Sequence, residues 1–393
     1  MSAERPSLRQ RLAAEDGALR EASRWRALRR WQPLSPTRAL RDGQPLTLFC
    51  ENDYLGLSAH PALRDAAIRA TEADGVGARS AHLIAGHHPE HAALEEEAAD
   101  WLGRPRALLF GSGYLANLGV LQGLLTADDL CVQDKLNHAC LLDGARLSAA
   151  TLRRYPHADV GAAARQLGVL PGSAALLATD GVFSMDGDLA PLPELSALCR
   201  REGALLLVDD AHAAGVLGVE GRGSADHLGL PADAVDLHMV TLGKAFGAYG
   251  ALVAGDAELI DSLLQRARSY LFATALPPAI AAAARAALRL IRGAEGEERR
   301  QRLAALVERF TLGAAQLGLP LLPSDTAIQP LLLGDDARAV QAAEALAERG
   351  FGVVAIRPPT VPEGRARLRI TLSAAHGPEQ VDALLQALGE VLA

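Results

Sequence analysis

The sequence predicts an α/β protein in which helices flank a mostly parallel central sheet. Short, continuous apolar runs are the predicted strands, at residues 107–110, 130–133, 174–179, 204–208 and 237–242. Helical stretches alternate with them, at residues 91–102, 114–125 and 193–202. Uninterrupted apolar runs between helices are typical of strands that are buried on both faces. Because ligands of such sheets bind beyond the carboxyl ends of the strands, polar residues at these ends form the candidate site.

We expect the large sheet domain to span residues 46–285, with a smaller part on either side of it in the sequence. Residues 8–31 carry apolar side chains at helical spacing, which predicts an amphipathic helix within an N-terminal helical segment, residues 1–45. Its apolar face would cover the main domain or a partner subunit. Residues 286–393 are predicted to form a small α+β domain, with strands at 328–333, 352–356 and 367–372 and helices at 337–348 and 378–392.

The composition indicates a cytoplasmic protein that binds neither nucleic acid nor membrane. A net charge of -8 argues against the basic face that binding to phosphates of nucleic acid requires. No apolar run approaches the ~18 residues that cross a bilayer, and the N-terminus lacks the apolar core of a signal peptide. The four cysteines have no metal-type spacing, so we expect reduced thiols and no metal site. They are Cys50, Cys131, Cys140 and Cys199.

Lysine is rare in this chain, which contains only Lys135 and Lys244. Lys244 follows an apolar run and lies in a turn between Gly243 and Gly247. A partly desolvated lysine in such a place is neutral often enough to attack a carbonyl carbon and form a Schiff base. A solvated loop lysine is the alternative interpretation, because most lysines are exposed.

Asp209 ends the apolar run at residues 204–208 and is a second candidate for chemistry. A carboxylate at a buried strand end is costly unless it meets a cation. The protonated ring nitrogen of pyridoxal phosphate is such a cation, and Asp209 would keep it protonated. A helix cap and a metal ligand are the alternative roles for this carboxylate.

The turn at residues 110–114 joins a predicted strand to a predicted helix and contains Gly111, Ser112 and Gly113. Small residues allow backbone N–H groups to approach a phosphate at a helix N-terminus. The spacing matches neither a dinucleotide fingerprint nor a Walker loop, so a phosphate monoester fits better than a pyrophosphate.

His138, Ser184 and Thr241 also follow predicted strands. The imidazole of His138 is suited to stacking on an aromatic ring, although a solvated loop histidine is an equal alternative. The two hydroxyl groups could contact a ligand or satisfy the local backbone.

Motifs along nearly the whole chain resemble those of the α-oxoamine synthases, a branch of the fold-type I pyridoxal-phosphate-dependent transferases. The motifs are NDYLGL at 52–57, GSGYLAN at 111–117, NHA at 137–139, GVFSMDGD at 181–188, VDDAH at 208–212, GRGS at 221–224, TLGKAFG at 241–247 and AIRPPTVP at 355–362. Their joint occurrence is highly specific. In the glycine-rich loop GVGARSAHLIAG at residues 75–86, Arg79 and Ala81 depart from the residues common in the family.

The resemblance implies a role for each matching position. Lys244 would form the Schiff base and act as general base, Asp209 would pair with the ring nitrogen, and His138 would stack on the ring; these three are the catalytic candidates. The expected cofactor contacts are Gly113, Tyr114, His138, Ser184, Asp209, His212, Thr241 and Lys244. The expected substrate contacts are Arg29, Asn52, His138, Arg357 and Thr360. Among these, Arg357 is expected to clamp the carboxylate of the amino acid.

The resemblance also implies the reaction, which condenses an amino acid with an acyl thioester and releases carbon dioxide. The string at 355–362 favours L-alanine and a pimeloyl thioester, carried by coenzyme A or by an acyl carrier protein. A homodimer with its site at the interface is expected, with candidate surfaces at residues 8–31 and 272–274. The alternatives are a relative that uses glycine or serine, an aminotransferase, and a non-catalytic sensing domain of the same fold.

Overall fold

The computed structural model describes residues 7–392, which form two compact units. The large unit comprises Asn52–Ser184 and Asp188–Leu303. The small unit comprises the residues up to Glu51, Met185–Gly187 and the residues from Ala304 onward. The small unit therefore combines the two ends of the chain. The three domain spans expected from the sequence stay a prediction.

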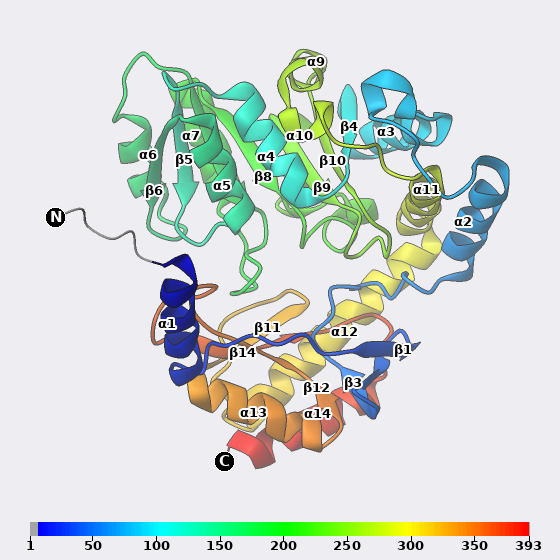
Figure 1. Ribbon diagram of the computed structural model, residues 1–393, viewed down its shortest axis with the longest axis vertical. Coiled ribbons are helices and arrows are strands. Elements are labelled where there is room, and N and C mark those ends of the chain that lie inside the picture. Colours follow the sequence, from blue (N-terminus) through cyan, green and yellow to red (C-terminus); the bar gives the residue numbers. More distant parts are fainter. Residues whose placement is uncertain (1–6, 393) are drawn as a thin grey trace. The chain divides into compact units, whose positions relative to one another are not determined.

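A seven-stranded sheet forms the centre of the large unit, in the order β4-β10-β9-β8-β7-β5-β6 (Figure 1). The strands are β4 (Arg106–Phe110), β5 (Leu130–Asp134), β6 (Thr151–Tyr155), β7 (Ala175–Asp180), β8 (Leu205–Asp209), β9 (Leu237–Thr241) and β10 (Ala251–Gly255). Strand β10 lies between β4 and β9 and is antiparallel to both of them, whereas all the other strand pairs of this sheet are parallel. The sheet is thus mostly parallel, as the apolar runs predict, and β6 and β10 are strands that the sequence interpretation did not include.

Helices cover both faces of this sheet (Figure 1). In β8, Leu206 and Val208 belong to one hydrophobic cluster and Leu207 to another, because successive side chains of a strand point to opposite faces. The helices of the large unit are α2 (Pro61–Asp74), α3 (Pro89–Leu102), α4 (Gly113–Leu124), α5 (Ala139–Ser148), α6 (Val160–Leu167), α7 (Leu192–Glu202), α8 (Ser224–His227), α9 (Ala257–Arg266), α10 (Arg268–Leu271) and α11 (Pro278–Arg292). The boundary between the units falls inside α12 (Ala294–Gln316).

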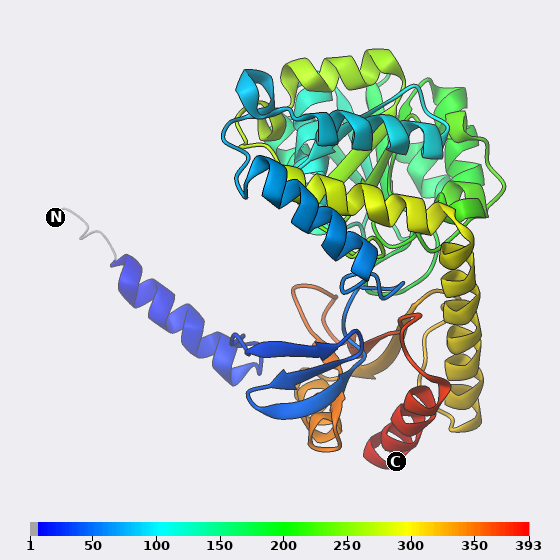
Figure 2. The ribbon, with the colours of Figure 1, turned by 90° about the vertical axis from the view of Figure 1, so that its right-hand side faces the viewer.

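Helices α2 and α11 lie side by side in the large unit (Figure 2). Their contact is lined by Ala70, Ala279 and Ala282, all of which are buried. Small side chains at a helix contact allow the two backbones to approach closely. The alanine-rich sequence of α11 is therefore explained by packing within the protein.

The small unit contains two further sheets. One has the order β1-β2-β3-β12 and the other β11-β14-β13. Their strands are β1 (Trp31–Ser35), β2 (Arg38–Arg41), β3 (Gln44–Leu48), β11 (Ile328–Gly334), β12 (Phe351–Gly352), β13 (Val354–Ile356) and β14 (Ala366–Thr371). The helices are α1 (Leu8–Glu21), α13 (Asp336–Glu348) and α14 (Pro378–Leu392).

Helix α1 is shorter than the sequence predicts, because it ends at Glu21 and not near residue 31. Ser23 adopts a positive φ of 55°, which takes the chain out of the helix. The next residue, Arg24, forms ion pairs with Asp336 and Glu363, so the following chain is held within the small unit and Trp31 begins a strand. None of the residues of α1 is buried, and the helix projects away from β1–β3 (Figure 2).

A buried arginine explains why Met185–Gly187 belongs to the small unit. Arg367 is 1 % exposed and pairs with Asp186 at 2.8 Å, while it also donates to the carbonyl of Met185 at 2.9 Å. A buried guanidinium needs such partners because its charge cannot be neutralised.

Among the residues that the structure describes, no helix combines the length and the apolar character needed to cross a membrane.

His157 links two carboxylates of the large unit. Its Nδ1 lies 3.2 Å from Asp134, and its Nε2 lies 2.7 Å from Asp188. Burial by itself lowers the pKa of His157, but the hydrogen bonds to both carboxylates outweigh burial and raise the pKa to about 10. The charged imidazole therefore stabilises the fold fully below the unfolded pKa of about 6.5, and this contribution is lost as pH rises through about 10.

We expect His157→Gln to reduce the free energy of unfolding by about 1–2 kcal/mol near pH 6, since partial exposure weakens a charge-assisted hydrogen bond. The difference from the wild type should shrink as the pH approaches and passes about 10. Urea denaturation at several pH values measures this difference, with the exposed His227→Gln as control. A difference that stays constant or grows with pH contradicts the prediction.

Candidate active site

The carboxyl ends of β7, β8 and β9 border a cavity of about 180 Å³ in the large unit. Asp180 and Asp209, the last residues of β7 and β8, are neighbours in the strand register. The cavity is lined by Gly113, Tyr114, His138, Cys140, Asp180, Ser184, Asp209, Ala211, His212, Met239, Thr241 and Lys244. The fold thus gathers around one cavity all the residues that the sequence interpretation names as cofactor contacts.

Asp209 is almost fully buried, with 5 % of its surface exposed. Its Oδ2 accepts a hydrogen bond from Asn117 Nδ2 at 2.6 Å, and its Oδ1 accepts one from the backbone N–H of Ala211 at 3.0 Å. Burial raises the pKa of Asp209, while the charge of Lys244 and these hydrogen bonds act in the opposite sense. A further cation in the cavity would therefore stabilise the carboxylate.

Lys244 lies in the loop after β9, where its Nζ is 2.8 Å from Nε2 of His212. The other ring nitrogen of His212 lies 2.6 Å from the hydroxyl of Tyr54, which in turn donates to Oδ1 of Asn52 at 3.2 Å. A continuous hydrogen-bond path thus runs from Asn52, an expected substrate contact, to Lys244. This path holds the amine beside the cavity.

His138 precedes α5 and caps that helix, because its Nδ1 accepts the backbone N–H of Cys140 at 3.3 Å. Its own backbone N–H donates to the carboxylate of Asp180 at 3.1 Å. Burial lowers the pKa of His138, although the charge of Asp209 opposes this shift. The ring is therefore neutral near pH 7, and a neutral imidazole can stack on a positively charged ring without repelling it.

The first turn of α4 provides the expected phosphate contacts, Gly113 and Tyr114. Ser112 caps the helix by accepting the backbone N–H of Leu115 at 3.3 Å. Backbone N–H groups in a first turn have no partner within the helix, and the helix dipole favours an anion there. The hydroxyl-bearing residue Thr241 borders the same cavity, as does Ser184.

Arg29, Arg357 and Thr360, the remaining expected substrate contacts, belong to the small unit. The guanidinium of Arg357 donates to the backbone carbonyl of Ser23. The guanidinium of Arg29 lies 3.7 Å from the carboxylate of Glu344, and Thr360 is exposed. The role of these three residues stays a prediction.

The sequence did not predict four polar residues that lie at or beside the cavity: Tyr54, Asn117, Cys140 and Asp180. Tyr54 and Asn117 lie inside quoted motifs, but nothing in a single sequence shows that an internal helix residue such as Asn117 points to a strand end. Asp180 could have been found by the same argument as Asp209, since it also follows a buried apolar run. Burial, followed by the charge of Asp209, raises the pKa of Asp180 well above its usual range.

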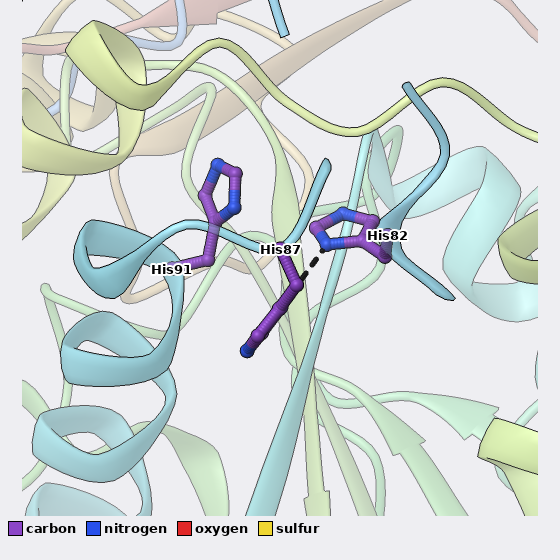
Figure 3. A group of neighbouring side chains, drawn as sticks. All are labelled: His82, His87 and His91. Atoms are coloured by element: carbon purple, nitrogen blue, oxygen red, sulfur yellow. Dashed lines mark hydrogen bonds between the residues drawn. The ribbon is translucent and has the colours of Figure 1, made fainter. Parts of the chain in front are cut away.

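A group of histidines lies elsewhere in the large unit, at His82, His87 and His91 (Figure 3). Their ligand nitrogens lie within 4.8 Å of one another, and Nδ1 of His82 is 3.2 Å from Nδ1 of His87. Both nitrogens of His91 are engaged, however, because Nδ1 accepts the N–H of His88 and Nε2 donates to the carbonyl of Leu276. We therefore assign this group a structural role in holding the segment between α2 and α3.

Comparisons with known proteins show the family of this chain. A model of the aminotransferase class I and II family matches residues 44–388. The 8-amino-7-oxononanoate synthase of Methylococcus capsulatus is 54 % identical over 373 residues, which cover 95 % of each chain. A variant serine palmitoyltransferase from S. paucimobilis, solved with bound PLP and myriocin, has a TM-score of 0.93 at 30 % identity, with 98 % of both chains covered. The 8-amino-7-oxononanoate synthase of Francisella tularensis has a TM-score of 0.77 at 30 % identity, with 88 % of this chain and 98 % of that chain covered.

The fold is that of a fold-type I, pyridoxal-phosphate-dependent transferase, which confirms the predicted fold class. The chain belongs to the aminotransferase class I and II family and, within it, to the 8-amino-7-oxononanoate synthases, acyl-transferring enzymes of biotin biosynthesis. The resemblance to the α-oxoamine synthases is thereby confirmed, as is the dependence on pyridoxal phosphate.

The loop that carries Lys244 depends on a glycine with a positive φ. Gly247 has φ 62°, and its N–H donates to the carbonyl of Lys244 at 2.8 Å. A Cβ at this position would lie 2.3 Å from the backbone nitrogen of Ser58. Any side chain would therefore combine an unfavourable conformation with a backbone clash.

We expect Gly247→Ala to reduce the free energy of unfolding by at least about 2 kcal/mol. Gly243→Ala in the same loop is the matched control, because its nearest contact would be an ordinary 3.8 Å from Oγ1 of Thr241. Chemical denaturation of both variants measures the difference. Equal stability of the two variants would show that the turn does not require glycine.

Proposed function

We propose that this chain condenses L-alanine with a pimeloyl thioester to give 8-amino-7-oxononanoate, carbon dioxide and a free thiol. The observation that carries the proposal is the meeting of Lys244, Asp209 and His138 at one cavity, in a chain 54 % identical to a synthase of that product. Coenzyme A and an acyl carrier protein are the two proposed carriers of the acyl group.

The groups around the cavity fit pyridoxal phosphate. Lys244 offers an amine for the aldehyde carbon, Asp209 offers a buried carboxylate for the ring nitrogen, and the first turn of α4 offers N–H groups for the phosphate. Gly113, Tyr114, His138, Ser184, His212 and Thr241 complete the proposed contacts. When bound, the cofactor supplies an electron-withdrawing ring that makes the α-proton of an amino acid removable.

Lys244 has two proposed tasks. It holds the cofactor at rest, and after the amine of alanine has taken its place, Nζ accepts the proton from the α-carbon. His212, 2.8 Å from Nζ, keeps the amine beside the cavity during this exchange. A general base positioned in this way contributes about 10²–10⁴ to the rate.

The proposed substrate contacts orient alanine for bond formation. Arg357 binds its carboxylate through a planar, two-pronged contact, and the remaining contacts are Arg29, Asn52, His138 and Thr360. The α-carbon of alanine then bonds to the acyl carbonyl carbon, and the thiol leaves with a proton. The carboxyl carbon of alanine leaves as carbon dioxide, and a proton replaces it.

We also propose that the enzyme is a cytoplasmic homodimer, with neither nucleic acid nor a membrane as partner. Exposed apolar residues in the two candidate regions support a subunit surface, because burial of apolar groups favours protein association. Leu8 of α1 is 59 % exposed and Phe272 is 72 % exposed. Both lie in the regions that the sequence interpretation names as candidate interfaces.

Lys244→Ala should remove the covalent attachment of the cofactor and lower kcat by at least about 10³-fold, because the amine both binds the cofactor and accepts the proton from the α-carbon of alanine. Borohydride reduction followed by peptide mass spectrometry shows the attachment, and a steady-state assay shows the rate. Lys135→Ala is the matched control, since Lys135 is exposed and is the only other lysine in the chain. Attachment to Lys135 or a wild-type rate in Lys244→Ala would refute the proposed role.

Arg357→Ala should raise the KM for alanine at least about tenfold while the cofactor stays attached, because the variant loses a charge-assisted contact with the substrate carboxylate. Arg365→Ala, an exposed arginine in the same segment, is the control. The same assay with serine and glycine separates the proposed activity from that of a serine-using relative, which the likeness to serine palmitoyltransferase makes the second candidate. An unchanged KM for alanine would remove Arg357 from the substrate site.

A further inference from the structure

Asn117 is a fully buried amide that contacts the key carboxylate of the cavity. It lies in α4 with 0 % of its surface exposed. Its Nδ2 donates to Oδ2 of Asp209 at 2.6 Å and to Sγ of Cys140 at 3.1 Å. Asn117 does not line the cavity, whereas Asp209 and Cys140 do. Any effect of Asn117 on chemistry is therefore transmitted through these neighbours.

The orientation of the amide indicates that Asp209 is charged in this arrangement. An ionised carboxylate can only accept hydrogen bonds, so it must face the NH₂ side of the amide. Oδ1 of Asn117 then has no hydrogen-bond partner among the described residues. A buried acceptor without a partner costs free energy, and the two bonds from Nδ2 must offset this cost. A neutral Asp209 could instead donate to Oδ1 of a flipped amide.

We propose that Asn117 is a positioning residue that holds the Asp209 carboxylate ionised and oriented for the ring nitrogen of the cofactor. This inference rests on the proposed function, since the ring nitrogen belongs to the cofactor named there. This role requires the N–H donor of the amide, because a side chain of the same volume without a donor cannot stabilise the charge of Asp209.

Helix α4 also connects Asn117 to the proposed phosphate contact. Gly113, a proposed phosphate contact, and Asn117 are four residues apart and lie on the same face of the helix. One rigid turn therefore connects the phosphate contact to the residue that orients the ring-nitrogen acid. The cofactor would be held at both ends by groups whose separation a single helix determines.

Two variants of Asn117 separate the positioning role from a packing role. Asn117→Leu removes the donor, and Asn117→Asp keeps the shape but places a second carboxylate against Asp209, so that the two share a proton. We expect the cofactor Kd to rise at least about tenfold in Asn117→Leu and further in Asn117→Asp. The protonated fraction of the ring nitrogen, measured by NMR with ¹⁵N-labelled cofactor, should fall in the same order. A packing role predicts the reverse order, with the isosteric Asn117→Asp closest to the wild type.

Gln133 provides a matched control in β5. It is also 0 % exposed, its Nε2 also contacts a cysteine sulfur, and its Oε1 also lacks a partner among the described residues. Its other hydrogen bond reaches the carbonyl of Leu141 and not Asp209. Gln133→Leu should therefore destabilise the fold without changing protonation of the ring nitrogen. A loss of protonation in Gln133→Leu equal to that in Asn117→Leu would overturn the inference.

If neither Asn117 variant folds, Cys140→Ala tests the same contact, because it removes the acceptor that fixes the second N–H of Asn117. In Cys140→Ala we expect the cofactor Kd to rise roughly twofold or more and the protonated fraction of the ring nitrogen to fall. Unchanged ring protonation in every variant that folds would overturn the inference. If the wild type itself does not attach the cofactor to Lys244, the proposed function fails instead, so the two failures are distinguishable.

Discussion

The carboxylate of Asp209, buried at the end of β8, is the constraint on which the site depends. Burial opposes its charge, and the charge of Asp209 in turn raises the pKa of the neighbouring Asp180. The contributions that favour the charge include the ammonium of Lys244 after β9, the N–H of Ala211 and the amide of Asn117 in α4. Helix, strand and loop must therefore all be in position before the carboxylate can remain charged.

The parallel topology of the sheet provides these positions. Because β7, β8 and β9 run in the same direction, their carboxyl ends meet at one edge, and Asp180, Asp209 and Thr241 are brought together although they are far apart in sequence. The two carboxylates are then handled differently. Both carboxyl groups line the cavity, but Asp180 accepts the backbone N–H of His138 and so fixes a loop, whereas Asp209 accepts hydrogen bonds from Asn117 and Ala211.

The sequence alone predicted those features that depend on local pattern. Strands such as β5 and β8 are continuous apolar runs, and Lys244 and Asp209 stand out because they follow such runs. The N-terminal helix was predicted too long, because spacing of apolar residues cannot show that Arg24 pairs with residues more than 300 positions away. Asn117 could not be selected for the same reason, since its partner lies 92 residues further along the chain. Long-range polar contacts are the part that a pattern does not encode.

The backbone does not distinguish the substrates of this family. A serine palmitoyltransferase superposes with a TM-score of 0.93 at only 30 % identity, so enzymes with different names share the architecture. A single methylene or hydroxyl in a pocket changes discrimination by about 1–3 kcal/mol, which a few side chains can supply without moving the backbone. Under the proposed function, the groups that hold the cofactor must in contrast keep their geometry, because proton removal requires the ring nitrogen, the amine and the carboxylate together. Membership of the 8-amino-7-oxononanoate synthases therefore follows from the 54 % identity along the chain and not from the shared backbone architecture.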